Sequence, residues 1–86
     1  MNVDTWVTEM KRSALPRFLK ETTGMAMARL SYGGKVTETY ENICKEAGIH
    51  HNSLPRHLTK LLLAGLLRKE HDAGYVCIFY LTRPSE

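Results

Sequence analysis

Side chains that carry chemistry gather in the middle of the chain. The stretch from residue 44 to residue 60 holds most of them: Cys44, His50, His51, Asn52, Arg56, His57 and Lys60. Thiolate and imidazole are zinc ligands, imidazole is also a general acid–base group, and guanidinium and amide groups recognise base edges. Three kinds of chemistry therefore have to be weighed, namely metal binding, catalysis and nucleic-acid recognition.

Metal binding and catalysis lack the additional residues that each would need. The two cysteines, Cys44 and Cys77, do not form a closely spaced pair. The side chains of the adjacent residues His50 and His51 are expected to diverge unless the turn that carries them is unusual. Cys44 with His50 would supply two ligands, which is too few for a zinc site. No nucleophile stands beside a base and an acid as a catalytic set. We therefore expect no enzymatic activity, no metal or other cofactor, and no small-molecule ligand.

Length and charge set the broad class. The 86 residues suffice for one domain, residues 1–86, with a formal net charge of +3 that permits nucleic-acid binding without requiring it. A chain this short buries only about 60% of its unfolded surface, so a partner subunit would help it. No apolar run approaches the length of a membrane span, and Met1–Met10 does not resemble a signal peptide. Together with two cysteines expected to be buried thiols, these features predict a cytoplasmic protein with no membrane association.

Four helices and a hairpin are predicted along the chain. The apolar stripe from Val3 to Phe18 predicts an N-terminal helix over residues 3–20, capped by Asp4 and either kinked or split at Pro16. Thr22 to Gly24 interrupt the pattern, and a second helix follows over residues 23–32. After a short extended link at residues 35–37 that pairs as an edge strand, Thr39 caps a helix over residues 40–47. Residues 66–70 and 75–82 then read as strands joined by a turn at 72–74.

The fourth helix contains an unexpected proline. An amphipathic pattern anchored by leucines covers residues 53–65, yet Pro55 lies near its start. In a helix beginning at His50, Pro55 would delete a backbone hydrogen bond at a cost of about 3 kcal/mol. If Asn52 or Ser53 caps the helix, the missing N–H falls in the first turn and costs nothing. We therefore predict the later start, with His50 and His51 in the preceding loop.

This order predicts an α+β fold, mainly α. Helices 40–47 and 53–65 are joined by a turn at Gly48, which is typical of a helix-turn-helix, and the hairpin 66–82 follows as a wing. Residues 43–81 resemble the winged helix-turn-helix of ArsR-type transcription regulators. The resemblance lies in "ICKEAGI", "LPRHLTKLLLAGLLRKE" and "DAGYVCIFYLT". It implies a winged helix-turn-helix over residues 22–82 with an extra N-terminal helix, no effector domain, and double-stranded DNA as the partner.

The resemblance also implies which residues meet DNA. It places these residues toward the major groove: His51, Asn52, Ser53, Pro55, Arg56 and Thr59. Arg56 is the principal candidate, because a guanidinium bonds two acceptors on guanine or grips a phosphate, whereas Asn52 either pairs with adenine or caps the helix. The expected phosphate contacts are Lys35, Lys45 and Lys60, and on the wing Arg68, Lys69 and His71. His57 corresponds to a family position that is half buried, so a packing role is expected for it in preference to a DNA contact.

Two features depart from the family pattern. The paired cysteines of its metal sensors are absent, and Leu62 and Leu63 stand where the family usually carries charges. The extra leucines predict another buried face, covered by the N-terminal helix of the same chain or of a second one. We expect a homodimer whose interface is formed by Trp6, Val7, Met10, Leu62 and Leu63. Such a dimer would present two reading helices about 34 Å apart.

The sequence therefore predicts a small homodimeric transcriptional regulator, a repressor, that binds specific double-stranded DNA. The alternative is a winged-helix module that binds another protein and has no specific affinity for DNA. Its support is the modest charge and a wing tip, His71 to Gly74, that lacks lysine and arginine. A steep loss of binding with salt would distinguish the two.

Overall fold

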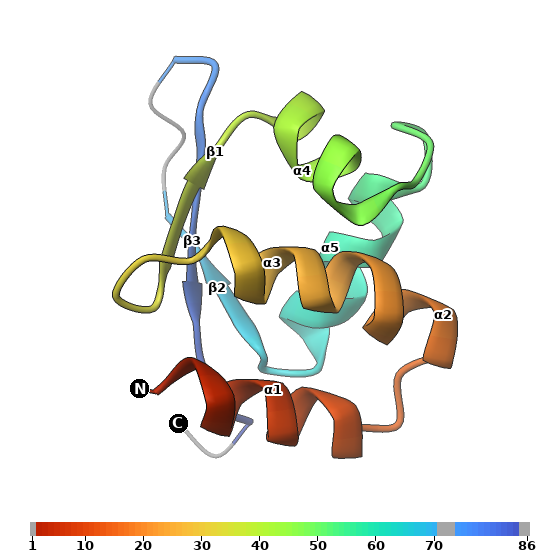
Figure 1. Ribbon diagram of the computed structural model, residues 1–86, viewed down its shortest axis with the longest axis vertical. Helices are drawn as coiled ribbons and strands as arrows, with labels where there is room; N and C mark the ends of the chain where they lie inside the picture. Colours follow the sequence, from red (N-terminus) through yellow and green to blue (C-terminus); the bar gives the residue numbers. More distant parts are fainter. Residues whose placement is uncertain (1, 71–73, 85–86) are drawn as a thin grey trace.

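A computed structural model of the chain describes residues 2–70 and 74–84. Within these residues, helices pack on one face of a three-stranded antiparallel sheet, which confirms the predicted α+β, mainly α class (Figure 1). The elements in chain order are α1 (Val3–Arg12), α2 (Arg17–Leu19), the π-helical segment η1 (Lys20–Gly24), α3 (Met25–Leu30), β1 (Lys35–Glu38), α4 (Tyr40–Ala47), α5 (Leu54–Leu63), β2 (Leu67–Lys69) and β3 (Cys77–Leu81).

The N-terminal helix is shorter than predicted. Asn2, not Asp4, is the N-cap of α1, because the Asn2 side chain accepts a hydrogen bond of 2.7 Å from the Asp4 backbone N–H. Asp4 instead lies in the first turn, where a carboxylate favours the positive end of the helix dipole. At the other end, Ser13 is the C-cap, and its hydroxyl donates to the Met10 carbonyl oxygen. Residues 3–20 are therefore split before Pro16, and the N-cap of α2 is Pro16 itself.

The predicted interruption at Thr22 to Gly24 is wrong. The segments α2, η1 and α3 run without a break in helical backbone angles, and Gly24 itself has φ −58° and ψ −50°. A Cβ at Gly24 would lie 2.7 Å from the Met10 sulfur. This glycine therefore serves a close approach between α1 and the next helix, not a chain break. The helix consequently begins at Arg17, earlier than predicted, and ends at Leu30 because Ser31 is extended.

The pair α4 and α5 follows the predicted pattern closely. The Thr39 side chain accepts a hydrogen bond from the Asn42 N–H at 3.1 Å, as an N-cap should. Gly48 then ends α4 at φ 69°, in the left-handed region that glycine adopts without strain. The chain turns and enters α5 at Leu54. The later start predicted from Pro55 is therefore confirmed.

The sheet has the order β1-β3-β2. Antiparallel pairing of β2 with β3 confirms the predicted hairpin, although both strands are shorter than predicted, and β1 pairs with the other side of β3 as the expected edge strand. Val36 on β1 stands opposite Phe79 on β3, and both are buried. The period of two in a strand places alternate residues of β3 on the core. The core face of β3 comprises Cys77, Phe79 and Leu81.

One hydrophobic core lies between the sheet and the helices. Its largest fully buried side chains include Trp6, Met10, Leu19, Met27, Ile43, Leu54, Leu61 and Phe79. Trp6 donates its indole N–H to the Leu66 carbonyl oxygen at 2.7 Å, which satisfies the polar atom of the bulkiest side chain and ties α1 to the start of the hairpin. Across residues 2–70 and 74–84, none of the helices has the length and apolar character needed to cross a membrane.

Candidate nucleic-acid interface

Helix α5 has two different faces. The core side is buried through Leu54, His57, Leu58 and Leu61. The outward side, called here the α5 stripe, consists of the exposed residues Pro55, Arg56, Thr59, Lys60 and Leu63. Arg56 and Lys60 stand one turn apart on this stripe. Helix α5 contains no acidic residue, and within the described residues neither cation forms an ion pair. The stripe is therefore a cationic surface that is not neutralised locally.

The hydroxyl proton of Thr59, on the α5 stripe, is used in a hydrogen bond within the helix. The hydroxyl donates to the Pro55 carbonyl oxygen, one turn earlier in the helix, at 2.9 Å. The hydroxyl oxygen can still accept. In this rotamer Thr59 would meet an amino group on a base, whereas a phosphate oxygen needs a donor.

The loop before α5 holds the two adjacent histidines. Ser53 N–H donates to the His50 carbonyl oxygen at 2.9 Å, so residues 50–53 form a turn, as predicted for His50 and His51. The His50 ring nitrogen Nδ1 accepts from the Asn52 N–H at 3.2 Å. The two imidazole rings lie 4.2 Å apart between centroids at an angle of 31°. Their rings are therefore neighbours, contrary to the expectation that adjacent histidines diverge.

The prediction that Asn52 or Ser53 caps α5 is confirmed in position, since Ser53 is the N-cap residue, but the capping hydrogen bond does not form. Neither Asn52 nor Ser53 caps the helix with its side chain; Ser53 occupies the N-cap position, but at φ −84° and ψ −24° it already has helical backbone angles. A capping side chain needs an extended backbone at this position to reach the next free N–H groups. The turn at His50 winds directly into the helix instead. Pro55, as the second helical residue, removes one N–H that would otherwise need a partner.

His57 packs inside, as the sequence predicted. Its Nδ1 lies 2.7 Å from the Thr23 hydroxyl, and its ring meets Phe18 edge to face at a centroid distance of 6.0 Å. Burial lowers the pKa of His57 below its ordinary value of 6.5, and the nearby cations Arg56 and Lys60 lower it further. The Thr23 partner was missed because residues 22–24 were interpreted as a break. The sequence signal for it is the 3.6-residue period continuing from Leu19 through Thr23 to Met27.

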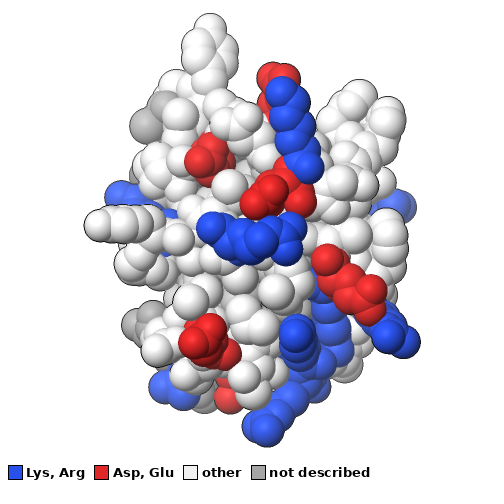
Figure 2. All heavy atoms as spheres, in the orientation of Figure 1, with Lys and Arg blue, Asp and Glu red and all other residues white. Residues whose placement is uncertain are grey.

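Helix α4 presents a neutralised surface. Lys45, a predicted phosphate contact, lies 3.4 Å from Glu41 one turn earlier, and Glu46 pairs with Arg29 of α3 at 3.3 Å. Figure 2 shows the same mixture on the face covered by α3 and α4, where acidic and basic side chains alternate. A phosphate would have to compete with Glu41 for Lys45. Lys45 is therefore a weaker candidate for a phosphate contact than Arg56 or Lys60.

Two further predicted cations lie on the sheet, away from the α5 stripe. Lys35, Tyr80 and Arg68 stand opposite one another across the three strands, on the face turned away from the helices. The Arg68 guanidinium carbon lies 4.4 Å from the Tyr80 ring centroid and the Lys35 nitrogen lies 5.7 Å from it. Both cations therefore flank one aromatic ring, which holds them by cation–π attraction. The structure does not bring them together with Arg56.

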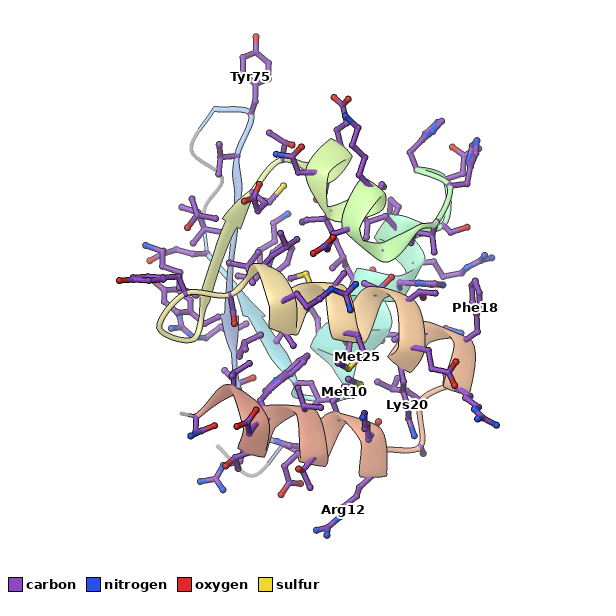
Figure 3. The ribbon with its side chains drawn as sticks, in the orientation of Figure 1. Met10, Arg12, Phe18, Lys20, Met25 and Tyr75 are labelled. Carbon is purple, nitrogen blue, oxygen red and sulfur yellow. The ribbon has the colours of Figure 1, made fainter. Side chains whose placement is uncertain are left out.

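Of the other two residues predicted to lie on a wing, Lys69 is within the described chain and His71 is not. Lys69 points to the helical side of the sheet, with its nitrogen 5.9 Å from the Phe79 ring centroid. His71 lies outside the described residues. Beyond it, Tyr75 projects from the end of the hairpin and is 94% exposed (Figure 3).

The predicted dimer interface contains two core residues. Trp6 and Met10 are fully buried by the chain's own side chains, so the surface they were expected to offer is already covered. Val7 and Leu62 are partly buried against the same core. Leu63, at 83% exposure, is the member of the set that presents a large apolar side chain to solvent. The N-terminal helix of the same chain, one of the two alternatives, therefore covers the core.

Cys44 and Cys77 are buried thiols that are not joined in a disulfide, as expected. Burial raises the pKa of Cys44 above its ordinary value of 9.0, so it stays protonated and unreactive at neutral pH. Across the described ranges, no three His, Cys, Asp or Glu side chains are grouped so that they could hold a metal ion. Comparison of the chain with family models, with curated proteins and with solved structures gives no match.

Proposed function

We propose that the chain is a winged helix-turn-helix protein that binds double-stranded DNA, with α5 in the major groove and the β2–β3 hairpin as the wing. Supporting this is the order of elements from α3 to β3, in which a helix pair joined by a glycine turn precedes a hairpin. The observation that carries the proposal is the α5 stripe, where Arg56 and Lys60 are exposed on a helix without acidic residues. By contrast, Lys45 on α4 and Arg29 on α3 have carboxylate partners.

Arg56 is proposed as the base-reading residue and Lys60 as a phosphate contact. Arg56 lies at the third position of α5, and the first turns of a recognition helix are the part that reaches base edges. A bidentate arginine–guanine pair discriminates against other bases by about 1–3 kcal/mol. Lys35 and Arg68, on the outward face of the sheet, are proposed only as contacts to DNA that bends around the domain.

The test is selection of bound sequences from a random duplex library, followed by affinity measurements at several salt concentrations. We expect an enriched motif and a log–log salt slope of about −0.9 per phosphate contact. Arg56→Ala should relax the preference at one base position, whereas Arg12→Ala is the matched control because it removes the same charge from the last turn of α1. Absence of binding at low salt, or an unchanged motif with Arg56→Ala, would contradict the assignment.

A homodimeric transcriptional regulator, acting as a repressor, is the biological role we propose for such binding. Since Trp6 and Met10 are buried, a second copy would have to use surface residues, with Leu63 as the exposed apolar residue among those predicted. A palindromic enriched motif and a dimer mass in sedimentation would support this role. Leu63→Glu should then yield a monomer with the fold unchanged.

One observation favours a second function, a protein-binding module. Large side chains stand in solvent at Tyr32, Leu63 and Tyr75, with exposures of 91%, 83% and 94%. Aromatic residues are enriched where proteins meet. Binding to a protein through such residues would depend weakly on salt, so the same salt titration separates the two functions.

A further inference from the structure

A surface cavity lies where α1 gives way to the next helix. Its volume is about 450 Å³, and its lining consists of Lys11, Leu15, Arg17, Lys20, Glu21 and Met25. That volume lies in the range of pockets that hold small molecules. None of the lining residues belongs to the α5 stripe or to the hairpin, so the proposed DNA binding does not explain the cavity.

The charges of the cavity are unbalanced toward positive. Arg17 and Glu21 neutralise each other through an ion pair of 2.6 Å at the rim. Lys11 and Lys20 form no ion pair with any residue in the described ranges. Figure 2 shows lysine and arginine side chains gathered on this part of the surface, below α3. Two positive charges therefore remain for an anionic ligand.

Lys20 is held in place by the protein. It is partly buried, and its ammonium donates to the Lys11 carbonyl oxygen at 2.7 Å, in the last turn of α1. Figure 3 shows Lys20 reaching from η1 toward α1, while Arg12 points away into solvent. An ammonium has three N–H donors, so two remain free for a ligand. A cation fixed in this way loses little side-chain entropy when it binds an anion.

The other wall of the cavity is apolar. Leu15 and Met25 are partly buried and pack against the hydrophobic core. Met25 directly follows Gly24, whose close contact with Met10 brings the two helices together. A purely inorganic anion would leave this wall in contact with water, and an uncharged ligand would leave the lysines unused. The lining therefore matches a molecule with one charged end and one apolar end.

We propose that this cavity binds a small organic monoanion, namely a carboxylate with an aromatic or branched apolar body. The carboxylate accepts hydrogen bonds from Lys20 and lies near Lys11, and the apolar body covers Leu15 and Met25. The site is independent of DNA binding, because it shares no residue with the α5 stripe.

Backbone amide NMR titration with phenylacetate tests the proposal. We expect saturable shifts that concentrate at Lys11, Leu15, Lys20 and Met25. Acetate lacks the apolar body and 2-phenylethanol lacks the charge, so the affinity of each should be lower than that of phenylacetate by about tenfold or more. The absence of saturable shifts with millimolar phenylacetate, shifts elsewhere in the chain, or equal binding of 2-phenylethanol would overturn the proposal.

Two lysine variants locate the anion. Lys20→Met and Lys11→Met should each weaken phenylacetate binding by about tenfold, whereas Lys60→Met on α5 is the matched control and should bind as the parent does. Lys20→Met also loses the bond to α1, so thermal melting should accompany it. Within the described residues the Lys11 side chain forms no hydrogen bond or ion pair, so Lys11→Met keeps the test valid if the first variant unfolds. Unchanged binding in Lys11→Met would overturn the proposal. The proposal would also be overturned if the parent protein does not bind phenylacetate and the lysine variants instead weaken the binding of duplex DNA.

Discussion

The hydroxyl of Thr23 and the Nδ1 atom of His57 lie 2.7 Å apart in the interior, although 34 residues separate them in the sequence. The contact joins η1 to α5, the helix that carries the proposed DNA-reading residues. Thr23 is fully buried, His57 is buried, and Phe18 meets the His57 ring edge to face. The orientation of α5 therefore depends on a polar pair inside the core as well as on apolar packing.

Replacing Thr23 by valine should destabilise the fold. The two side chains have the same shape, but valine leaves the buried His57 nitrogen without its partner, at a cost of about 1–3 kcal/mol. Urea unfolding measures the change. Thr22→Val is the control, since the Thr22 hydroxyl donates to the Phe18 carbonyl oxygen of its own helix at 2.7 Å. Equal losses in the two variants would remove any special role for the pair.

Stability should fall in mild acid because of His57. Its pKa is lowered in the folded state, chiefly by burial and then by Arg56 and Lys60, so the unfolded chain binds the proton more readily. This contribution to stability is complete above pH 6.5 and is lost as the pH falls below that value. Unfolding free energies at about pH 7.5 and about pH 5.5 should show the loss. The loss should be smaller in His57→Gln, and an identical loss there would assign it to other groups.

Alanine at Gly24 should destabilise the protein despite its better helix propensity. Alanine gains about 1 kcal/mol over glycine in a helix, but its Cβ would stand 2.7 Å from the sulfur of the fully buried Met10, and overpacking costs about 1–3 kcal/mol. Met10→Val removes the atoms that clash. In that background Gly24→Ala should stabilise the fold by up to about 1 kcal/mol. A double-mutant cycle in chemical unfolding measures the coupling, and additive effects would disprove it.

Gly48 should tolerate asparagine better than alanine. At φ 69° the left-handed backbone costs an alanine roughly 1–2 kcal/mol, whereas its Cβ would meet no atom of a tertiary neighbour within 4 Å. Asparagine adopts this conformation more readily, so Gly48→Asn should lose less. Thermal melting of the two variants compares them directly. Equal destabilisation would mean that the cost has another origin than backbone strain.

The elements that local chemistry determines were predictable from the sequence. Helix α4 begins after the N-cap Thr39 and ends at the left-handed Gly48, and both limits follow from residue type. Pro55 correctly indicates the late start of α5. The interruption expected at Gly24 was wrong because that glycine makes room for the Met10 side chain of another helix. Long-range packing of this kind leaves no local pattern in a single sequence.

The candidate site was predictable in part for the same reason. Helical periodicity places Arg56, Thr59 and Lys60 on one face of α5, and the structure confirms their exposure. Strand pairing decides where Lys35 and Arg68 lie, and it places them around Tyr80 on the other side of the sheet. The cavity beside Lys20 depends on how α1 folds back after the break at Pro16, a geometry that periodicity does not contain.

The two ends of the chain meet on one side of the molecule. Trp6 of α1 bonds the Leu66 carbonyl, and Pro84 lies so close to Gly65 that a Cβ there would be 2.9 Å from the proline Cα. Figure 1 shows both termini at the side opposite the loop that leads into α5. A fluorophore or surface tether attached at either end would therefore leave that loop and the first turns of α5 facing the solution.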